Sequence, residues 1–465
     1  MKNSRFKKWL FFSLLSLIFF SVCCMILRFR QDQQSEYIIL VGIDTLRADH
    51  LSCYGYQLET SPSIDEFAKG AILFQKSISQ SSWTLPSFAS IFTSLYYNQH
   101  KSGFQCLRNE KESMLNTTIL EDSFTTLAEV LKSHGYKTAA FTEGALMSPF
   151  FGVSQGFDLF KICSVPEDKI DELNPKQIRF KNIKNVVDES LKWINKNRGR
   201  KFFLFLHSYE THKPLRDPMG VSDIIKKEYV KNGLMTNPKE QFELKVEDFS
   251  YIYEQLILYD SEIRYLDYHL GRFFSALKDM DIYDKSLIIF TSDHGEEFGE
   301  HGGWGHGKAL YRESVFVPLI VKLPYQKKAV QEDRWTAQGI DIFPTILELS
   351  GIKNHNYYIS GRSLLSKPSM DIALTHHFWE NGNFVAVVKD GQKLIFNYDS
   401  PRDSVLFDLT KDPFERHNIL SIQEGKSGLA KFIDPVEIPT AVEGKCPDLI
   451  DEDTKMKLKG LGYIQ

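Results

Sequence analysis

The chain of 465 residues has little net charge and no compositional bias. Its 56 basic residues against 60 acidic residues give a formal charge of −4, which argues against nucleic acid as a partner. Its 28 glycines and 17 prolines are ordinary amounts, and no internal repeat is visible, so a fibrous or low-complexity chain is excluded. With 42% hydrophobic residues, the sequence predicts a globular protein that buries a large core.

Cysteines are also few, six in all, and two of them lie in the N-terminal apolar stretch. The other four are Cys53, Cys106, Cys163 and Cys446, and none of them forms a Cys-x-x-Cys pair. A structural zinc site is therefore not expected. Scattered cysteines in a large domain are more often buried singly than paired in disulfides.

The N-terminus has the pattern of a membrane signal anchor. Residues 1–8 are basic, and an uncharged stretch from Trp9 to Leu27 has almost the length that crosses a bilayer. More positive charge before the stretch than after it predicts a cytoplasmic stub at 1–8, a transmembrane segment at 9–27 and a linker at 28–36. The bulk of the chain would then lie outside the cytoplasm, in the periplasm or at the cell surface. A cleaved signal peptide is the alternative, but no small-x-small cleavage site follows.

Apolar runs of strand length alternate with stretches of helical periodicity along the main part of the chain. This alternation predicts an α/β fold, with a mostly parallel central sheet flanked by helices. The expected strands are 37–42, 138–142, 202–207, 286–292 and 317–323, and the expected helices include 125–134, 186–196 and 247–280.

The C-terminal part has a different pattern. Residues 384–396 predict two strands joined at Asp390-Gly391, because Asp-Gly between apolar runs is a strong hairpin signal. Residues 405–409 predict another short strand. We therefore expect a main domain over 37–365 and a small antiparallel α+β subdomain over 366–465.

Polar residues follow three of the expected strands. Asp44 follows the first, His212 comes shortly after the strand at 202–207, and Asp293 and His294 follow the strand at 286–292. Ligands bind beyond the carboxyl ends of strands in such sheets. Two carboxylates and an imidazole suit a divalent metal ion, with zinc or manganese favoured and calcium as an alternative. Each residue alone would more often cap a turn or face solvent.

Two histidines and a lysine are further candidates for chemistry. His212 and His306 are expected to bind a second metal ion or the substrate, or to protonate a leaving group. Lys308, in the same glycine-rich segment as His306, is a candidate contact for a phosphate or sulfate. His207 and His301 are weaker candidates for the same roles.

Thr84 is the candidate nucleophile. Pro86 and an apolar helical pattern over 87–95 place Thr84 at the start of a helix, where free N–H groups favour an anionic ester. A bound metal would lower the pKa of its hydroxyl and make it nucleophilic. The ordinary alternative is that Thr84 only caps the helix.

Many ordered segments resemble the sulfatase family of the alkaline phosphatase superfamily. The resemblance implies that family's fold, with Asp44, Asp293 and His294 as metal ligands and Thr84 as the nucleophile at the metal. It implies His212, His306 and Lys308 as substrate or second-metal residues. The segments that carry it are 44–56, 61–65, 258–267, 293–295, 304–308, 317–320, 341–345, 408–415 and 461–463.

Three positions depart from that family's pattern. Authentic sulfatases convert a Cys or Ser to formylglycine in a Cys/Ser-x-Pro-Ser-Arg context, but this chain has Thr84, and Phe88 replaces the arginine. Thr45 stands where many sulfatases have a second metal-binding aspartate. Relatives with a threonine nucleophile include nucleotide phosphodiesterases and phosphoethanolamine transferases.

The departures favour an ester hydrolase that attacks a phosphate or phosphonate ester through Thr84. A sulfuric ester hydrolase, a phosphoethanolamine-type transferase acting on an envelope glycan or lipid, and a non-catalytic surface binding module are the alternatives. The expected substrate is a small-molecule, glycan or lipid ester. The sequence predicts no oligomeric state.

Overall fold

The computed structural model describes residues 35–104, 117–163, 181–234, 249–353, 357–379, 382–420, 428–433, 451–461 and 463. The predicted anchor from Trp9 to Leu27 lies outside these residues, as do Cys106 and Cys446. No helix in the described part is both long enough and apolar enough to cross a bilayer. Cys53 and Cys163 are free thiols.

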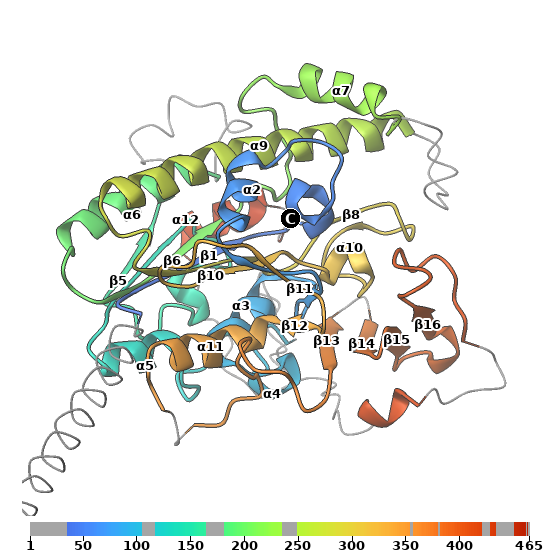
Figure 1. Ribbon diagram of the computed structural model, residues 1–465. Coiled ribbons are helices and arrows are strands. Elements are labelled where there is room, and N and C mark those ends of the chain that lie inside the picture. The colour runs from blue at the N-terminus through green and yellow to red at the C-terminus, as the bar shows by residue number, and fades with distance from the viewer. Residues whose placement is uncertain are drawn as a thin grey trace, which may run out of the picture.

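An eight-stranded sheet forms the centre of the molecule, in the order β11-β2-β10-β7-β1-β6-β4-β5 (Figure 1). Neighbouring strands are parallel except where β10 pairs with β7 and with β2, so the sheet is mostly parallel as predicted. The strands are β1 (Tyr37–Ile43), β2 (Ile72–Phe74), β4 (Lys137–Thr142), β5 (Leu159–Ile162), β6 (Phe202–Ser208), β7 (Ser286–Ser292), β10 (Leu319–Lys322) and β11 (Val330–Glu332).

Helices cover both faces of this sheet (Figure 1). One face carries α2 (Pro62–Ala68), α6 (Ile183–Lys196), α7 (Ser222–Lys231) and the long α9 (Phe249–Asp279). The other carries α3 (Thr84–Thr93), α5 (Leu127–Ser133), α11 (Ile342–Leu349) and α12 (Glu452–Gly460). Short elements complete the main part: α4 (Tyr97–His100), α10 (Arg312–Val315), β3 (Ser77–Ile78), β8 (Glu297–Phe298), β9 (Trp304–Gly305) and β12 (Ala337–Gln338).

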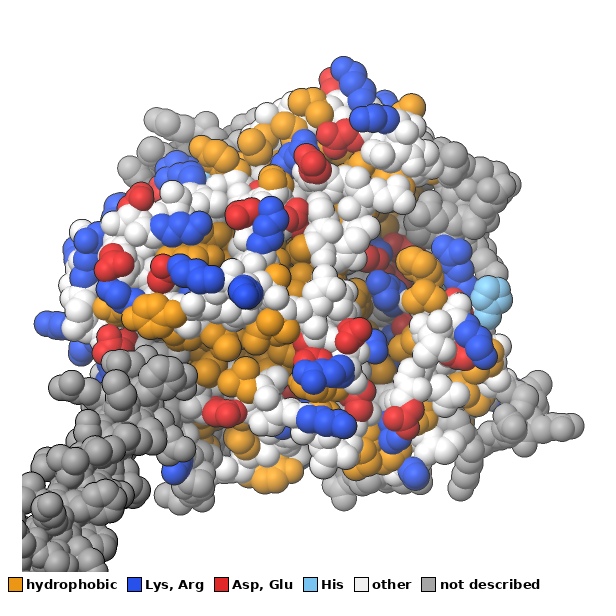
Figure 2. Space-filling view, in the orientation of Figure 1, with side chains coloured by type: hydrophobic (Ala, Val, Ile, Leu, Met, Phe, Trp, Pro, Cys, Tyr) orange, Lys and Arg blue, Asp and Glu red, His pale blue; other side chains and the backbone are white. Residues whose placement is uncertain are grey.

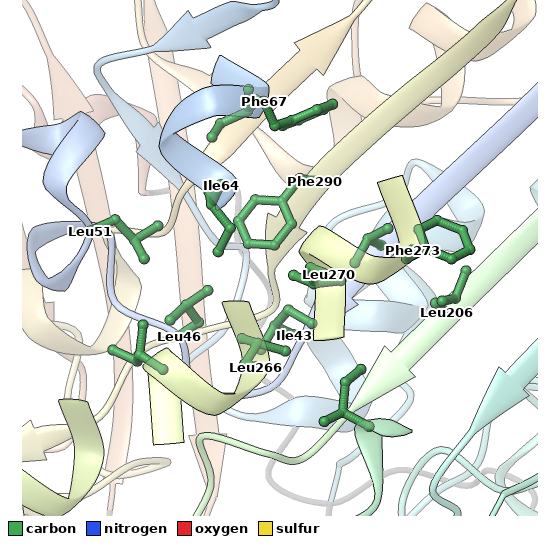
Figure 3. Packing of buried hydrophobic residues seen from close by; sticks show 14 of the residues in the cluster. Ile43, Leu46, Leu51, Ile64, Phe67, Leu206, Leu266, Leu270, Phe273 and Phe290 are labelled. Atoms are coloured by element: carbon green, nitrogen blue, oxygen red, sulfur yellow. The ribbon is translucent and has the colours of Figure 1, made fainter. Parts of the chain in front are cut away.

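Both faces are apolar because successive side chains of a strand point to opposite sides. In β1, Ile39 and Ile43 pack in the core beneath α9, whereas Ile38 and Leu40 pack in the core beside α3. Figure 3 shows the first core, with side chains from the strands against Leu266, Leu270 and Phe273 of α9 and Ile64 and Phe67 of α2. A continuous apolar run is therefore what a strand covered on both faces requires.

A separate four-stranded antiparallel sheet lies in the C-terminal part (Figure 1). It consists of β13 (Ile372–Trp379), β14 (Gly382–Lys389), β15 (Gln392–Asn397) and β16 (Val405–Asp408). The predicted hairpin is β14–β15, and both turn residues, Asp390 and Gly391, have positive φ. The domain boundary at residue 365 stays a prediction.

Charges are distributed over the surface without a region of one sign on the face shown in Figure 2, where basic and acidic side chains are interspersed. This agrees with the nearly balanced composition. Three adjacent parallel strands, β6, β1 and β7, end together: Ile43 pairs with both Ser208 and Ser292. The residues that follow these strands therefore meet at one edge of the sheet.

Candidate active site

Three of the predicted metal ligands converge at this edge. Asp44 follows β1, and Asp293 and His294 follow β7; all three are buried, and one ligand atom from each lies within 4.8 Å of the others. Asp44 Oδ1 and Asp293 Oδ2 have no hydrogen-bond partner among the described residues. Buried carboxylate oxygens without partners are costly unless a cation neutralises them. The donor set therefore fits a divalent metal ion.

The pKa shifts of these three residues also favour a bound cation. Burial, and then the facing carboxylate of Asp293, raise the pKa of Asp44 well above its usual range. Burial raises the pKa of Asp293 to about 7. Burial, and then the neighbouring His306, lower the pKa of His294 well below its ordinary value. Without a cation, the protein disfavours ionisation of both carboxylates and keeps the imidazole neutral. A bound cation would stabilise the two ionised carboxylates.

Thr84 points into this cluster. Its hydroxyl donates a hydrogen bond to Asp44 Oδ2 at 2.9 Å, and Oγ lies 3.4 Å from His294 Nε2. A third neighbour is the hydroxyl of Tyr463, 2.8 Å from the same oxygen. Thr84 is the first residue of α3, and the capping position belongs to Trp83. The helix-cap alternative for Thr84 is therefore not what the structure shows.

His212 and His306 face each other beside the cluster, with ring centroids 4.8 Å apart, and the ring of His306 is 4.6 Å from that of His294. His306 Nδ1 lies 2.9 Å from Glu296 Oε2. His212 Nδ1 lies 2.5 Å from the carbonyl of Lys213, and its Nε2 has no partner in the described part of the chain. Burial, and then His306, lower the pKa of His212 to about 3. An acceptor nitrogen is thus free to meet a ligand.

A cavity of about 780 Å³ opens beside the two histidines. Lys308 lines it but is exposed and donates to the carbonyl of Trp304 at 3.2 Å, so it lies at the rim and not beside Thr84. Lys213 also lines the cavity and pairs with Glu296 at 2.9 Å. The other lining residues are Trp83, Pro214, Leu215, Tyr251, Gln255, Glu296, Trp304, Gly305, Gly307, Lys459, Gly460, Leu461 and Tyr463.

Of the two weaker histidine candidates, one lies beside the metal cluster and the other does not. His207 is buried with Nε2 4.0 Å from Asp44 Oδ2, and neither ring nitrogen has a hydrogen-bond partner among the residues described. His301 pairs elsewhere, with Glu313 at 2.6 Å and the carbonyl of Glu415 at 2.9 Å. His207 therefore belongs to the site more closely than its low ranking predicted.

Sequence reasoning missed Glu296, Lys213 and Tyr463. Glu296 directly follows Asp293-His294-Gly295, and Lys213 directly follows His212. Their position next to strong candidates in the sequence could have indicated them. Although burial alone would raise the pKa of Glu296, His306 and Lys213 hold it well below its usual range. Tyr463 lies 379 positions from Thr84, and only its place in a family-like segment marked it.

The three departures also have structural counterparts. The ring of Phe88 packs against His207 with centroids 5.0 Å apart and against Phe205 at 5.5 Å, so apolar contacts fill the space around position 88. Thr45 has a φ of 57° and its hydroxyl donates to the carbonyl of Asp44. It offers its backbone N–H, not its side chain, to Asp293.

Comparison with known proteins identifies the family. Residues 36–352 match the sulfatase family model, and residues 299–434 match that of the N-sulphoglucosamine sulphohydrolase C-terminal region. The N-acetylglucosamine-6-O-sulfatase of Bacteroides thetaiotaomicron is 22% identical, over 86% of this chain and 85% of that protein. Human iduronate 2-sulfatase is 24% identical over 66% of this chain, and the match spans 62% of that protein's own length.

A solved structure shows the same fold. The phosphonate monoester hydrolase of Agrobacterium radiobacter superposes with a TM-score of 0.63 and 20% identity, covering 86% of this chain and 94% of that one. The chain therefore belongs to the sulfatase family of the alkaline phosphatase superfamily.

Proposed function

We propose that this protein is a metal-dependent hydrolase of phosphate or phosphonate esters, with Thr84 as nucleophile. The observation that carries the proposal is the Thr84 hydroxyl, which donates to Asp44 within a buried cluster where Asp44 Oδ1 and Asp293 Oδ2 lack partners among the described residues. A threonine cannot be oxidised to the aldehyde of formylglycine, so its hydroxyl itself must attack. Phosphorus accepts such an attack readily.

Asp44, Asp293, His294 and Thr84 would hold the metal, with zinc or manganese favoured by the histidine. When bound, the metal supplies Lewis acidity and lowers the pKa of the hydroxyl. Asp44 Oδ2 orients the hydroxyl through its hydrogen bond and is placed to take its proton. Oγ then forms a bond to phosphorus while the bond to the leaving oxygen breaks, and the leaving oxygen takes a proton from His306. Water cleaves the phosphothreonine in a second step and returns Thr84.

His306 is the proposed proton donor to the leaving oxygen, and His212, whose Nε2 is an acceptor, is a proposed contact for the substrate. They form a wall of the cavity next to the cluster, and Glu296 fixes the ring of His306. The wall also carries Trp83, Trp304, Lys213 and Lys308, a mixture of aromatic rings and cations that suits an anionic ester with an organic group, such as a glycan or lipid ester. Lys308 at the rim would meet the substrate on entry.

A sulfuric ester hydrolase is the second candidate, because the sulfatase model covers residues 36–352 and curated relatives carry that activity in their names. The same Thr84 oxygen would then attack sulfur. A location outside the cytoplasm, with residues 9–27 as the anchor, also belongs to the proposal and is supported by the N-terminal sequence pattern.

The test uses the full-length protein in detergent, loaded with zinc or manganese. Initial rates with an aryl phosphate, an aryl phosphonate monoester and an aryl sulfate rank the three ester classes. Faster cleavage of the sulfate would refute the phosphoryl preference. Thr84→Ala should abolish turnover, whereas Thr84→Ser should keep part of it. Mass spectrometry after acid quenching should find phosphate on Thr84, and full activity of Thr84→Ala would refute the nucleophile.

A further inference from the structure

The end of the chain returns to the centre of the molecule and is held there. Leu458 and Leu461, in and just after α12, are buried in the core that also contains α3 and α5. The backbone N–H of Tyr463 donates to the carbonyl of Leu458 at 2.9 Å. These contacts fix the position of the Tyr463 side chain.

The Tyr463 hydroxyl is a hydrogen-bond donor to the candidate nucleophile. Its oxygen lies 2.8 Å from Thr84 Oγ1. The one proton of the Thr84 hydroxyl goes to Asp44 Oδ2 at 2.9 Å, so the proton between Thr84 and Tyr463 comes from the phenol. The ring of Tyr463 packs beside the two histidines, with its centroid 5.4 Å from that of His212 and 6.0 Å from that of His306.

Tyr463 also occupies the side from which a substrate must approach. Thr84 is fully buried, and two neighbours of its oxygen are Asp44 and His294. The third neighbour, Tyr463, lines the 780 Å³ cavity. A group that reaches Thr84 from the cavity therefore passes beside the phenol.

We infer that Tyr463 is a substrate-contacting residue, whose phenolic O–H donates a hydrogen bond to the tetrahedral anionic group that is transferred at Thr84. This inference rests on the proposed function, and it names a chemistry that phosphate, phosphonate and sulfate groups share. A donor aimed at oxygens on which charge develops stabilises the transition state, and a hydrogen bond to a charged group is stronger than one to a neutral hydroxyl. When substrate binds, the Tyr463 hydroxyl thus exchanges its hydrogen bond to Thr84 for a stronger one to the anionic group.

The experiment compares wild type with Tyr463→Phe, which removes only the hydroxyl. Tyr325→Phe is the matched control, since Tyr325 is exposed and lies outside the site. Binding of inorganic phosphate and of sulfate to the metal-loaded, full-length protein is measured by calorimetry, beside kcat and KM for an aryl phosphate. We expect Tyr463→Phe to weaken anion binding about tenfold and to lower kcat/KM roughly ten- to hundredfold, while the control changes neither.

Unchanged or tighter anion binding by Tyr463→Phe would overturn the inference and would indicate that the phenol only obstructs the site. The thermal midpoint is measured in parallel, and if it falls, the anion affinity per folded molecule decides between the two outcomes. This readout is separate from the proposed function, because anion binding needs no attack by Thr84. Inactive Thr84→Ala with normal anion binding supports the nucleophile independently of Tyr463.

Discussion

Removing the metal should make the stability of this protein fall as the pH rises through neutrality. The reason is Asp293, whose pKa burial raises from 3.8 to about 7 in the metal-free site. An acid with a raised folded-state pKa binds its proton more tightly when folded. Its protonation therefore supports folding at low pH, and this support is lost progressively as the pH rises from about 4 through 7.

The magnitude follows from the two pKa values. A change from 3.8 to about 7 corresponds to about 4 kcal/mol of unfolding free energy, and relaxation of the buried site reduces this to about 2 to 4 kcal/mol. Asp44 faces Asp293 and adds to the same trend, because burial and Asp293 raise its pKa as well. A bound divalent cation should remove the loss, since it stabilises both ionised carboxylates.

The assay is chemical unfolding at pH 5.5 and pH 8, with chelator or with excess zinc or manganese. Asp293→Asn should flatten the chelator-treated profile and abolish stabilisation by metal, whereas Asp279→Asn, at an exposed carboxylate near the end of α9, should behave as wild type. The difference between each variant and wild type cancels the titration of groups that do not interact with Asp293; Asp44, which faces Asp293, changes together with it. If chelator-treated Asp293→Asn keeps the wild-type pH slope, the electrostatic reasoning about this cluster is wrong.

Three further predictions concern His301, Gly42 and His306. Burial alone would lower the pKa of His301, but its bond to Glu313 raises it from 6.5 to about 9. About 3 kcal/mol of stability should therefore be present below pH 6.5 and lost as the pH rises through 9. Unfolding of His301→Gln at pH 6 and pH 10 measures this, and an unchanged pH profile would contradict it. A Cβ on Gly42 would lie 2.7 Å from the ring of Phe88. Gly42→Ala should therefore lower the free energy of unfolding, measured with denaturant, by about 1 to 3 kcal/mol. An unchanged free energy would show that the ring moves freely. His306→Gln should lower kcat/KM for an aryl phosphate by about a hundredfold with an unchanged thermal midpoint, and equal turnover would exclude His306 from the leaving side.

The sequence allowed the sheet and the metal cluster to be predicted because both depend on local patterns. Apolar runs gave β1, β6 and β7, and the rule that ligands bind beyond strand ends brought Asp44, Asp293 and His294 together. The direction of β10 was not predictable in this way. An apolar run of residues 317–323 shows that a strand is buried but not which way it runs, and β10 proved antiparallel to both neighbours.

The parts of the site that the sequence did not reveal depend on tertiary contacts. Glu296 and His306 are ten positions apart and come together because β8 and β9 pair between them. Tyr463 contacts Thr84 because Leu458 and Leu461 pack in the main core. No periodicity or spacing encodes a contact between residues 379 positions apart. Short polar motifs at strand ends can thus be recognised in the sequence, whereas the residues that form the wall of the neighbouring cavity cannot.

Two of the departures from the sulfatase pattern, Thr84 and Phe88, lie on the same helix. Thr84 and Phe88 lie one turn apart on α3, and the Phe88 ring fills the space between His207, Phe205 and the backbone at Gly42. Phe88→Arg would place a guanidinium in this apolar space, next to a histidine whose pKa burial lowers to about 3. Changing Thr84 to Cys alone would leave that space unchanged. The neighbourhood of the candidate nucleophile therefore suits an uncharged residue at position 88, and this agrees with the proposed direct attack by the Thr84 hydroxyl.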